Sequence, residues 1–348
     1  MPKVTVIGTT SWGTTLAILL ARKNYSVFLW ARNEAEASNL INNPKSVLAY
    51  NVSFPRGITI TSRLKDAVED ADAVILAVPS QSMRQNIQTI KGMLKPPMLI
   101  ISAAKGLEIN TNKRMSEVIA EEIAPELRSN ICVLSGPNLA REILRGLPAS
   151  AVVANADVTV AIRAQTLLAT PTFNVYTNSD VIGVELGGAL KNVIALGAGM
   201  VDGLGYGDNA KAAFITRGLT EMAAIGLAMG ASPLTLSGLT GLGDLIATCV
   251  SPLSRNHFVG FQLAKGRSLK EITGAMLAPA EGIATTFAVW NLAQRLNLGM
   301  PITEKIYEVL YKDRSPQEVM SEILGAPGSH ELAGRKWQLF SLFRHKNQ

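Results

Sequence analysis

The sequence predicts an α/β protein: an N-terminal doubly wound (Rossmann-type) parallel sheet domain followed by an all-helical C-terminal domain. Up to about residue 180, short apolar and β-branched segments alternate with helical patterns. Beyond that point Ala, Leu, Gly and Met dominate, and the apolar residues recur with helical spacing. A chain of 348 residues also exceeds the usual size of one hydrophobic core. We therefore expect two domains, residues 1–185 and 186–348.

The strands of the first domain are expected where Val, Ile and Leu gather in short segments. A helix is expected directly after the first segment, over Trp12–Arg22. Because helical patterns separate the strands, we expect them to run parallel in one sheet. In chain order the expected strands are Val4–Ile7, Val27–Trp30, Ala73–Val78, Met98–Ser102, Ile131–Leu134, Ala151–Ala154 and Asn174–Tyr176.

Two helix starts in the second domain carry a capping pattern. Ser268 stands three residues before Glu271, and Ser315 is followed by Pro316 at the first helical position and Glu318 at the third. Neither a low-complexity linker nor an internal repeat separates the two halves. We therefore expect a cleft of fixed geometry between the domains, where ligand sites are common.

The charge balance favours a phosphate-bearing small ligand over a nucleic acid. The chain has 33 Lys and Arg against 27 Asp and Glu, a net charge of +6, and the basic residues are spread along it. The densest basic group lies near the C-terminus, where a solvated tail is the simpler interpretation. That group consists of Arg335, Lys336, Arg344, His345 and Lys346.

Cysteine content and hydropathy favour a soluble, cytoplasmic protein. Cys132 and Cys249 lack the spacing of a disulfide framework or a zinc site, so no metal is expected. The apolar stretch Val181–Val201 contains Glu185 and Lys191, which argues against a membrane span. The first strand follows the initiating Met-Pro-Lys at once, which leaves no room for a signal peptide.

The turn after the first strand has the pattern of a dinucleotide-binding turn. Gly8 and Gly13 match its first and third glycines, and the helix that begins there offers unpaired N–H groups to a pyrophosphate. We expect Gly8, Ser11, Trp12 and Gly13 to contact the cofactor. Thr10 replaces the second glycine, and its Cβ is expected to weaken the approach of the pyrophosphate.

The end of the second strand leaves both NAD and NADP possible. Arg32 can stack on an adenine or pair with a 2′-phosphate, and we place Arg32 and Asn33 at the cofactor. An exposed loop arginine is the alternative. NAD-specific sites commonly carry an acidic residue at this strand end, and we do not assign Glu34 to that position because it lies further along the chain.

Four longer segments identify a family resemblance. In their order and spacing, together with Val78-Pro79-Ser80 and Ala280-Glu281-Gly282, they resemble bacterial NAD(P)-dependent glycerol-3-phosphate dehydrogenase over nearly the whole chain. The segments are Ser102–Glu108 (Ser-Ala-Ala-Lys-Gly-Leu-Glu), Ser135–Ala140 (Ser-Gly-Pro-Asn-Leu-Ala), Gly188–Ala195 (Gly-Ala-Leu-Lys-Asn-Val-Ile-Ala) and Gly241–Asn256, which ends in Ser-Arg-Asn.

The resemblance implies an enzyme that interconverts dihydroxyacetone phosphate and sn-glycerol 3-phosphate, feeds glycerophospholipid synthesis and forms a homodimer. It implies a catalytic set of Lys191, Lys105 and Asp244. Implied substrate contacts are Lys105, Gly136, Asn138, Lys191, Asn192, Asp244, Ser254, Arg255 and Asn256. Implied cofactor contacts beyond the turn and Arg32 are Lys105, Ala140, Arg255, Pro279 and Glu281.

Several of these residues also make chemical sense without the resemblance. Lys191 lies between Leu190 and Val193 in an apolar helix, where a lysine is costly to bury unless it is paired or functional. Burial and a second cation would lower its pKa, and a carboxylate would raise it, which suits general acid–base catalysis. A stem that reaches the surface is the alternative. Asp244 could instead serve its glycine-rich turn, and Ser254 could simply cap a helix.

We interpret three departures from the family pattern as tuning rather than loss of function, and two other functions are kept as alternatives. Thr10 replaces a glycine, Asn138 stands where a serine is common, and Pro279 removes a backbone donor. One alternative is a reductase of the same plan that acts on a non-phosphorylated keto or hydroxy acid, and another is a nucleotide-binding sensor without turnover. Cys249 could be a nucleophile, but without a nearby histidine we interpret it as structural.

Overall fold

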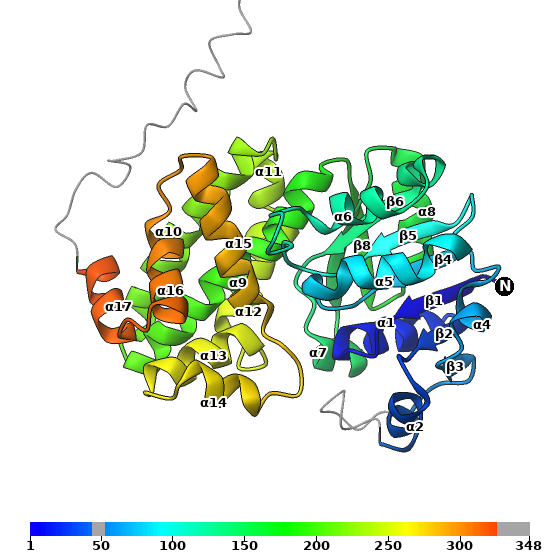
Figure 1. Ribbon diagram of the computed structural model, residues 1–348, viewed down its shortest axis with the longest axis horizontal. Coiled ribbons are helices and arrows are strands. Elements are labelled where there is room, and N and C mark those ends of the chain that lie inside the picture. Colours follow the sequence, from blue (N-terminus) through cyan, green and yellow to red (C-terminus); the bar gives the residue numbers. More distant parts are fainter. Residues whose placement is uncertain (44–52, 326–348) are drawn as a thin grey trace, which may run out of the picture.

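The structure, a computed structural model, describes residues 1–43 and 53–325 and divides into a sheet half and a helical half (Figure 1). Residues 3–178 hold every strand of the described chain, and residues 181–325 are helical. The expected order of a sheet domain followed by a helical domain is confirmed. The basic group from Arg335 to Lys346 lies outside the described residues.

Eight strands form one sheet in the order β3-β2-β1-β4-β5-β6-β7-β8. The outward growth of the sheet in both directions from β1 and β4 defines the doubly wound topology. The strands are β1 (Lys3–Ile7), β2 (Ser26–Trp30), β3 (Ile58–Thr61), β4 (Ala73–Leu76), β5 (Leu99–Ser102), β6 (Ile131–Ser135), β7 (Ala149–Ala154) and β8 (Phe173–Asn178).

Two features of the sheet differ from the prediction. The four-residue edge strand β3 was not predicted, and β6 pairs with β7 in antiparallel fashion, with Leu134 opposite Val153. The expectation of a wholly parallel sheet is wrong for this pair. The connection holds only the five-residue helix α7 (Ala140–Leu144), which is too short to carry the chain back along the sheet as a crossover helix does.

Side chains alternate between the two faces of the sheet, and each face is covered by helices. Val4 and Val6 of β1 pack with α1 (Ser11–Ala21) and α8 (Val158–Leu168) on one face. The other face packs against α4 (Leu64–Val68), α5 (Met83–Ile90) and α6 (Met115–Glu122). Helix α2 (Glu34–Asn42) lies at the β3 edge (Figure 1).

The carboxyl ends of the parallel strands face the helical domain, as the arrowhead of β1 shows in Figure 1. The loops that leave β1, β2, β4 and β5 therefore open toward the second domain. Ligands of open α/β folds bind at this edge, so the fold places the site between the domains.

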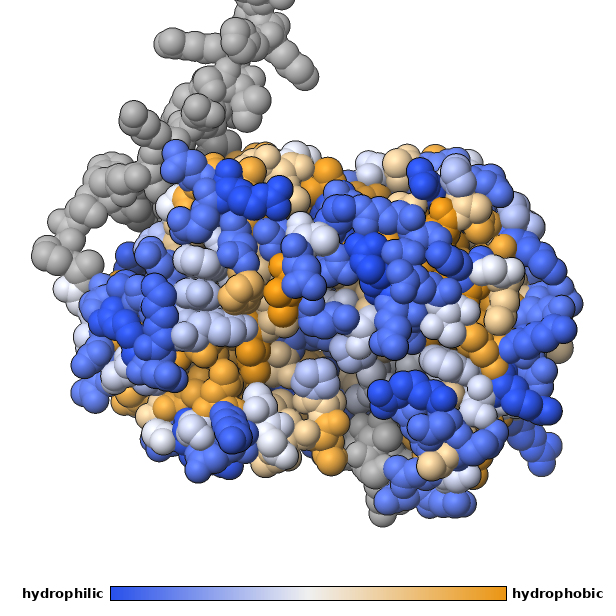
Figure 2. Space-filling model, viewed as in Figure 1, coloured by the Kyte–Doolittle hydropathy of each residue, from blue (hydrophilic) through white to orange (hydrophobic). Residues whose placement is uncertain are grey.

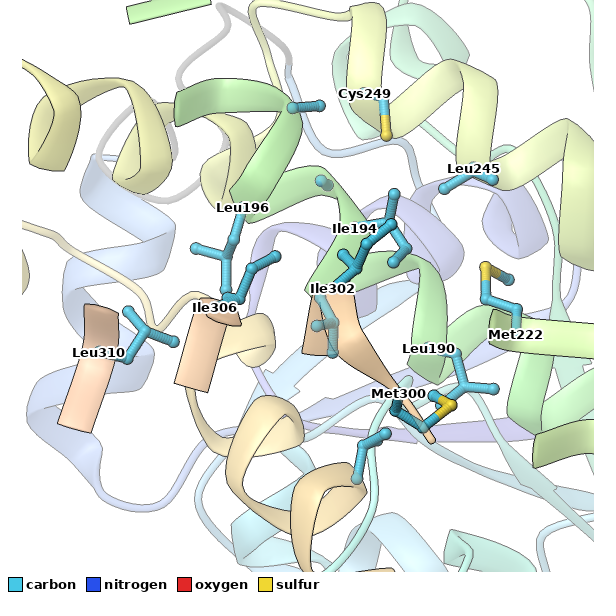
Figure 3. Close-up of a cluster of buried hydrophobic side chains, with 14 of the residues drawn as sticks. Leu190, Ile194, Leu196, Met222, Leu245, Cys249, Met300, Ile302, Ile306 and Leu310 are labelled. Carbon is cyan, nitrogen blue, oxygen red and sulfur yellow. The ribbon is translucent and has the colours of Figure 1, made fainter. Parts of the chain in front are cut away.

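The helical domain is built around α9 (Val181–Leu204), which is buried along most of its length. In Figure 3, Leu190 and Ile194 of α9 lie among side chains from other helices, including Met222, Leu245 and Ile306. The other helices are α10 (Gly207–Ala228), α11 (Pro233–Leu236), α12 (Asp244–Val250), α13 (Arg255–Ala264), α14 (Leu269–Gly274), α15 (Glu281–Arg295), α16 (Pro301–Tyr311) and α17 (Pro316–Leu324).

Two helical stretches, Val181–Leu204 and Pro233–Val250, are long and apolar enough to cross a membrane by length and composition alone. In α9, however, 89% of the apolar window is buried inside the protein, whereas for Pro233–Val250 the share is 44%. The apolar character of α9 is thus explained by its place in the core.

Of the two capping boxes expected at helix starts, one is present in the structure and the other is not. Ser268 caps α14, with its hydroxyl accepting from the Glu271 N–H at 3.3 Å while Glu271 accepts from the Ser268 N–H at 3.0 Å. Ser315 precedes α17 without a side-chain capping bond, so that expected capping box is wrong. The expected division between residues 185 and 186 falls inside α9 and stays a prediction.

Candidate active site

The first βα turn fits a dinucleotide because only glycine is tolerated at two of its positions. Gly8 has φ +111°, and a Cβ there would lie 2.8 Å from the Ala77 carbonyl oxygen. A Cβ at Gly13 would lie 2.1 Å from the Gly8 carbonyl oxygen. In the first turn of α1 the indole Nε1 of Trp12 is buried without a partner among the described residues. The tight turn therefore leads directly into a helix N-terminus that can receive a pyrophosphate.

The hydroxyl of Thr10 is bonded inside this turn. Thr10 is the N-cap of α1: its hydroxyl accepts from the Gly13 N–H at 3.1 Å and donates to the Ala77 carbonyl at 2.9 Å. The side chain is thus bonded inward against β4. The effect of the Thr10 Cβ on the approach of the pyrophosphate stays a prediction.

A polar cluster joins the turn after β2 to the turn after β1. Asn33 caps α2, accepting from the Glu36 N–H at 2.8 Å. The Glu36 carboxylate accepts from the hydroxyl of Thr9 and pairs with Arg32 Nε at 3.2 Å. Arg32, whose side chain is 79% exposed, is therefore already paired with a carboxylate. Sequence reasoning missed Glu36, although its spacing of four residues from Arg32 is the helical pairing distance.

The two predicted lysines and the predicted aspartate form one buried cluster between the domains. Asp244, at the start of α12, accepts from Lys105 Nζ at 2.7 Å on one oxygen and from Lys191 Nζ at 3.0 Å on the other. Lys105 follows β5 and also donates to the Gly136 carbonyl at 2.7 Å. Lys191 also donates to the Thr248 hydroxyl at 2.6 Å. Asp244 therefore does more than shape its glycine-rich turn, and the Lys191 amine is buried and paired rather than extended to the surface.

The electrostatics of the cluster place one amine near neutrality. Burial lowers the pKa of Lys191 to about 8, and the charge of Lys105 adds to this effect while Asp244 opposes it. Burial raises the pKa of Asp244, but the two ammonium groups outweigh it and hold that pKa below its usual range. One carboxylate thus stays ionised between two cations, of which Lys191 can exchange a proton near physiological pH.

Thr248 was not predicted as a site residue, although it stood within a motif segment. It lies one helical turn after Asp244 on α12, and its hydroxyl donates to Asp244 at 3.2 Å while it accepts from Lys191. The four-residue spacing on one helix is the signal that could have found it. Cys249 beside it is buried, and burial raises the pKa of its thiol to about 12, which agrees with a structural role.

Asn192 and Asn256 link three helices behind the lysines. The Asn192 amide donates to the Lys105 carbonyl at 3.1 Å, and its oxygen accepts from the Asn256 amide at 2.8 Å. The Asn256 oxygen in turn accepts from the Gly282 N–H at 2.9 Å. Both amides therefore take part in an internal chain that joins α9, α13 and α15 to the loop after β5.

The Ser254–Asn256 segment opens α13 at the edge of this cluster. Ser254 is the N-cap, accepting from the His257 N–H at 3.2 Å, as the simpler interpretation proposed. Arg255 donates to the Pro279 carbonyl at 2.8 Å, a contact that proline can accept because it retains its carbonyl. The ten-residue helix presents its positive end together with the Arg255 guanidinium.

Glu281 joins the two domains at the start of α15. Its carboxylate accepts from the Ser80 N–H at 3.1 Å and from the Ser80 hydroxyl, and Ser80 follows β4. Burial raises the pKa of Glu281, although the hydrogen bonds from Ser80 and the charge of Arg255 oppose it. Glu281 therefore lies at the sheet edge where the cofactor is expected.

Only part of the segment after β6 contacts the lysine cluster. The Gly136 carbonyl contacts Lys105, while the Asn138 amide donates to the Ser150 carbonyl at 3.0 Å and leaves its oxygen buried without a partner among the described residues. Ala140 begins α7, which packs against α1. Among the described residues, no group of three or more His, Cys, Asp or Glu side chains could hold a metal ion.

A second buried ion pair, which was not predicted, joins the helix of Lys191 to the sheet domain. Glu185, on α9, accepts from Arg114 at 2.6 Å, from the Ser116 N–H at 2.8 Å and from the Ser116 hydroxyl at 2.6 Å. Arg114 precedes α6 and forms an isolated antiparallel β-bridge with Leu107, which follows Lys105 by two residues. The pair therefore connects the Lys105 loop with α9.

Replacing Glu185 with glutamine is expected to lower the free energy of unfolding by about 3–5 kcal/mol, because the Arg114 guanidinium loses its buried counter-charge and keeps only the exposed Glu117. The matched control is Glu117→Gln, which removes an exposed partner of the same arginine, 3.0 Å away. It should cost at most about 1 kcal/mol. Urea unfolding of both variants measures the difference, and equal losses would contradict the assignment of Glu185–Arg114 as the stabilising pair.

Comparison with known proteins agrees with the fold. Residues 3–161 match the family described as NAD-dependent glycerol-3-phosphate dehydrogenase N-terminus, and residues 180–321 match the corresponding C-terminus. A glycerol-3-phosphate dehydrogenase [NAD(P)+] from Dehalococcoides mccartyi (strain CBDB1) is 56% identical over 348 residues, covering 99% of this chain and 97% of the relative. The chain belongs to the glycerol-3-phosphate dehydrogenase family.

Further relatives support this assignment. The enzyme of the same name from Geobacter metallireducens is 45% identical and covers 92% of this chain and 96% of its own length. The crystal structure of glycerol-3-phosphate dehydrogenase from Coxiella burnetii superposes with a TM-score of 0.86 at 35% identity, covering 92% of this chain and 98% of that one.

Membership of the glycerol-3-phosphate dehydrogenase family confirms the predicted enzyme class, cofactor and substrate class. The protein is an NAD(P)-dependent oxidoreductase that acts on a small triose phosphate and reduces dihydroxyacetone phosphate to glycerol 3-phosphate. A sensor without turnover and a reductase of non-phosphorylated acids are therefore set aside.

Proposed function

We propose that Lys191 is the general acid that protonates the carbonyl oxygen of dihydroxyacetone phosphate, and the general base for the hydroxyl of glycerol 3-phosphate in the reverse direction. When bound, the reduced nicotinamide supplies the hydride for the carbonyl carbon. The observation that carries the proposal is the buried Lys191 amine, 3.0 Å from Asp244 and with a pKa of about 8. An amine with a pKa close to the working pH can both give and regain a proton.

Asp244 and Lys105 complete the catalytic set in this proposal. The Asp244 carboxylate holds both ammonium groups and so orients Lys191 Nζ toward the space between the domains. Lys105, at the carboxyl end of β5, adds a fixed positive charge beside the oxygen on which negative charge develops. Thr248 supports this geometry by bonding to both Lys191 and Asp244.

Substrate and cofactor are proposed to bind side by side at this cluster, with Lys105 and Arg255 contacting both. The N-terminus of α13 and the Arg255 guanidinium suit the substrate phosphate, since both offer positive charge and N–H donors. The proposed substrate contacts are Lys105, Gly136, Asn138, Lys191, Asn192, Asp244, Ser254, Arg255 and Asn256. The proposed cofactor contacts are Gly8, Ser11, Trp12, Gly13, Arg32, Asn33, Lys105, Ala140, Arg255, Pro279 and Glu281.

The pH dependence tests this proposal. Ketone reduction needs the protonated amine, so kcat/KM for dihydroxyacetone phosphate should fall as pH rises through about 8. Alcohol oxidation needs the neutral amine, so kcat/KM for glycerol 3-phosphate should rise through the same pH. Spectrophotometric rates with purified protein, NADH or NAD⁺ and each substrate give both profiles.

Measuring both directions distinguishes the titration of Lys191 from a general loss of activity at high pH. Loss of folding or of cofactor binding at high pH would lower both rates together, whereas the role of Lys191 requires them to move in opposite directions. Profiles without an inflection near pH 8 in either direction would rule out Lys191 as the acid–base group.

We also propose a cytoplasmic homodimer without a membrane span, whose product feeds glycerophospholipid synthesis. Exposed apolar side chains on the helical domain, including Ile246, Val250 and Phe258, suit a subunit contact. On the face drawn in Figure 2, hydrophobic residues gather over the helical half, while hydrophilic residues cover much of the sheet half.

A further inference from the structure

We propose that Glu36 is a specificity-determining residue that makes this protein favour NAD over NADP. The inference rests on the proposed nucleotide site and asks which of the two dinucleotides that site prefers. Glu36 lies in the first turn of α2, and its carboxylate accepts from the Thr9 hydroxyl, from the Arg32 N–H at 2.9 Å and from Arg32 Nε at 3.2 Å.

The position of this carboxylate is the first argument. Thr9 directly follows Gly8 in the phosphate-binding turn, and Arg32 lies two residues beyond the end of β2. In a doubly wound fold the adenosine ribose binds at the carboxyl end of the second strand, beside that turn. A carboxylate that bonds to both segments therefore lies where the ribose 2′ substituent is expected.

Charge is the second argument. A ribose 2′-hydroxyl can donate a hydrogen bond to a carboxylate, whereas a 2′-phosphate brings like charge against it. Arg32 is the cation that would otherwise attract the 2′-phosphate, and Glu36 already pairs with it. Although burial raises the pKa of Glu36, the bonds from Thr9 and Arg32 outweigh it and keep that pKa below its ordinary value, so the carboxylate is ionised at neutral pH.

Helix capping alone does not explain the geometry. The bond from the Arg32 N–H and the Asn33 cap are local to the start of α2 and would occur in an ordinary helix. The bond from Thr9 is different, because it comes from 27 residues earlier, in the turn that follows β1. Glu34, in the same helical turn, points elsewhere and accepts from the Ser62 hydroxyl.

This difference between the two glutamates supplies a matched control. Glu36→Gln and Glu34→Gln remove the same charge from the same turn of α2, but only Glu36 contacts Thr9 and Arg32. Binding of NADH and of NADPH is measured separately for each protein by titration of the reduced nicotinamide fluorescence, without substrate.

The wild-type protein should bind NADH more tightly than NADPH. Glu36→Gln should tighten NADPH binding on the order of tenfold, since one negative charge near the 2′-phosphate is removed and Arg32 is freed. Its affinity for NADH should change much less, which also shows that the variant is folded. Glu34→Gln should keep the wild-type ratio, and adding Arg32→Ala to Glu36→Gln should abolish the gain in NADPH affinity.

The outcomes test the nucleotide site and the role of Glu36 separately. Failure of the wild-type protein to bind either dinucleotide would contradict the proposed nucleotide site itself. Binding of both with a ratio that Glu36→Gln leaves unchanged, or that Glu34→Gln shifts equally, would overturn the role of Glu36 and leave the nucleotide site standing.

Discussion

Replacing Lys191 with alanine is expected to lower kcat for dihydroxyacetone phosphate reduction by about 10²–10⁴-fold, the usual contribution of a positioned acid or base. The variant loses the buried amine whose pKa of about 8 suits proton transfer, whereas Lys105 stays bonded to Asp244 and to the Gly136 carbonyl. NADH affinity should change little, since Lys191 contacts the catalytic carboxylate and not the βα turn. Steady-state rates and NADH titration measure the two effects separately.

Two variants serve as controls for that measurement. Lys191→Met keeps the volume of the side chain and removes its charge, so it should be inactive; it should remain folded, because Asp244 keeps Lys105 as its counter-charge. Lys305→Ala removes a lysine that pairs with Glu308 and Glu322 on the far part of the helical domain, and it should keep full activity. Turnover in Lys191→Ala within a few-fold of the wild type would exclude the proposed role.

The sheet and the main helices could be predicted from the sequence because their apolar periodicity is strong. Val4–Ile7 and Ile131–Leu134 carry enough β-branched and aliphatic residues to predict strands β1 and β6 within a residue of their ends. The alternating segment Ile58–Thr61 carries the same signal in only four residues, and it forms the missed edge strand β3. The direction of β7 depends on how the short α7 connection packs, which no local pattern specifies.

The residues of the candidate site that stand in sequence motifs could be predicted. Lys105, Lys191 and Asp244 stand in recognisable segments, and the structure brings both lysines within hydrogen-bonding distance of Asp244. Glu185 and Glu36 stand outside these segments, and the bonds from Ser116 to Glu185 and from Thr9 to Glu36 join residues 69 and 27 positions apart in the chain. Such pairs arise only when the domains and loops have folded together, so sequence spacing alone does not show them.

Replacing Asp244 with asparagine is expected to destabilise the protein and to shift the pH dependence of catalysis. The amide keeps the volume and a hydrogen-bonding oxygen, but it leaves Lys105 and Lys191 as two buried like charges. Removing one partner of a buried ion pair costs about 3–5 kcal/mol. The pKa of Lys191 should fall further, because the carboxylate that raises it is gone while burial and the charge of Lys105 remain.

The sign of the pH effect on stability follows from this lowered pKa. Between the pKa of Lys191 in the folded protein and the higher value in the unfolded chain, the unfolded state binds more protons, so stability rises with pH. The loss in Asp244→Asn should therefore be larger at pH 7 than at a pH of about 9.5, and urea unfolding at both pH values measures it.

Asp202→Asn is the matched control, because Asp202 is likewise shared by two basic groups, Lys211 at 2.6 Å and His257 at 2.7 Å, but lies partly exposed. It should cost less stability than Asp244→Asn and leave the inflection near pH 8 in place. In Asp244→Asn the same inflection should move to lower pH, which a purely structural role of the carboxylate would not produce. An unmoved inflection in Asp244→Asn would show that the carboxylate does not set the proton affinity of Lys191.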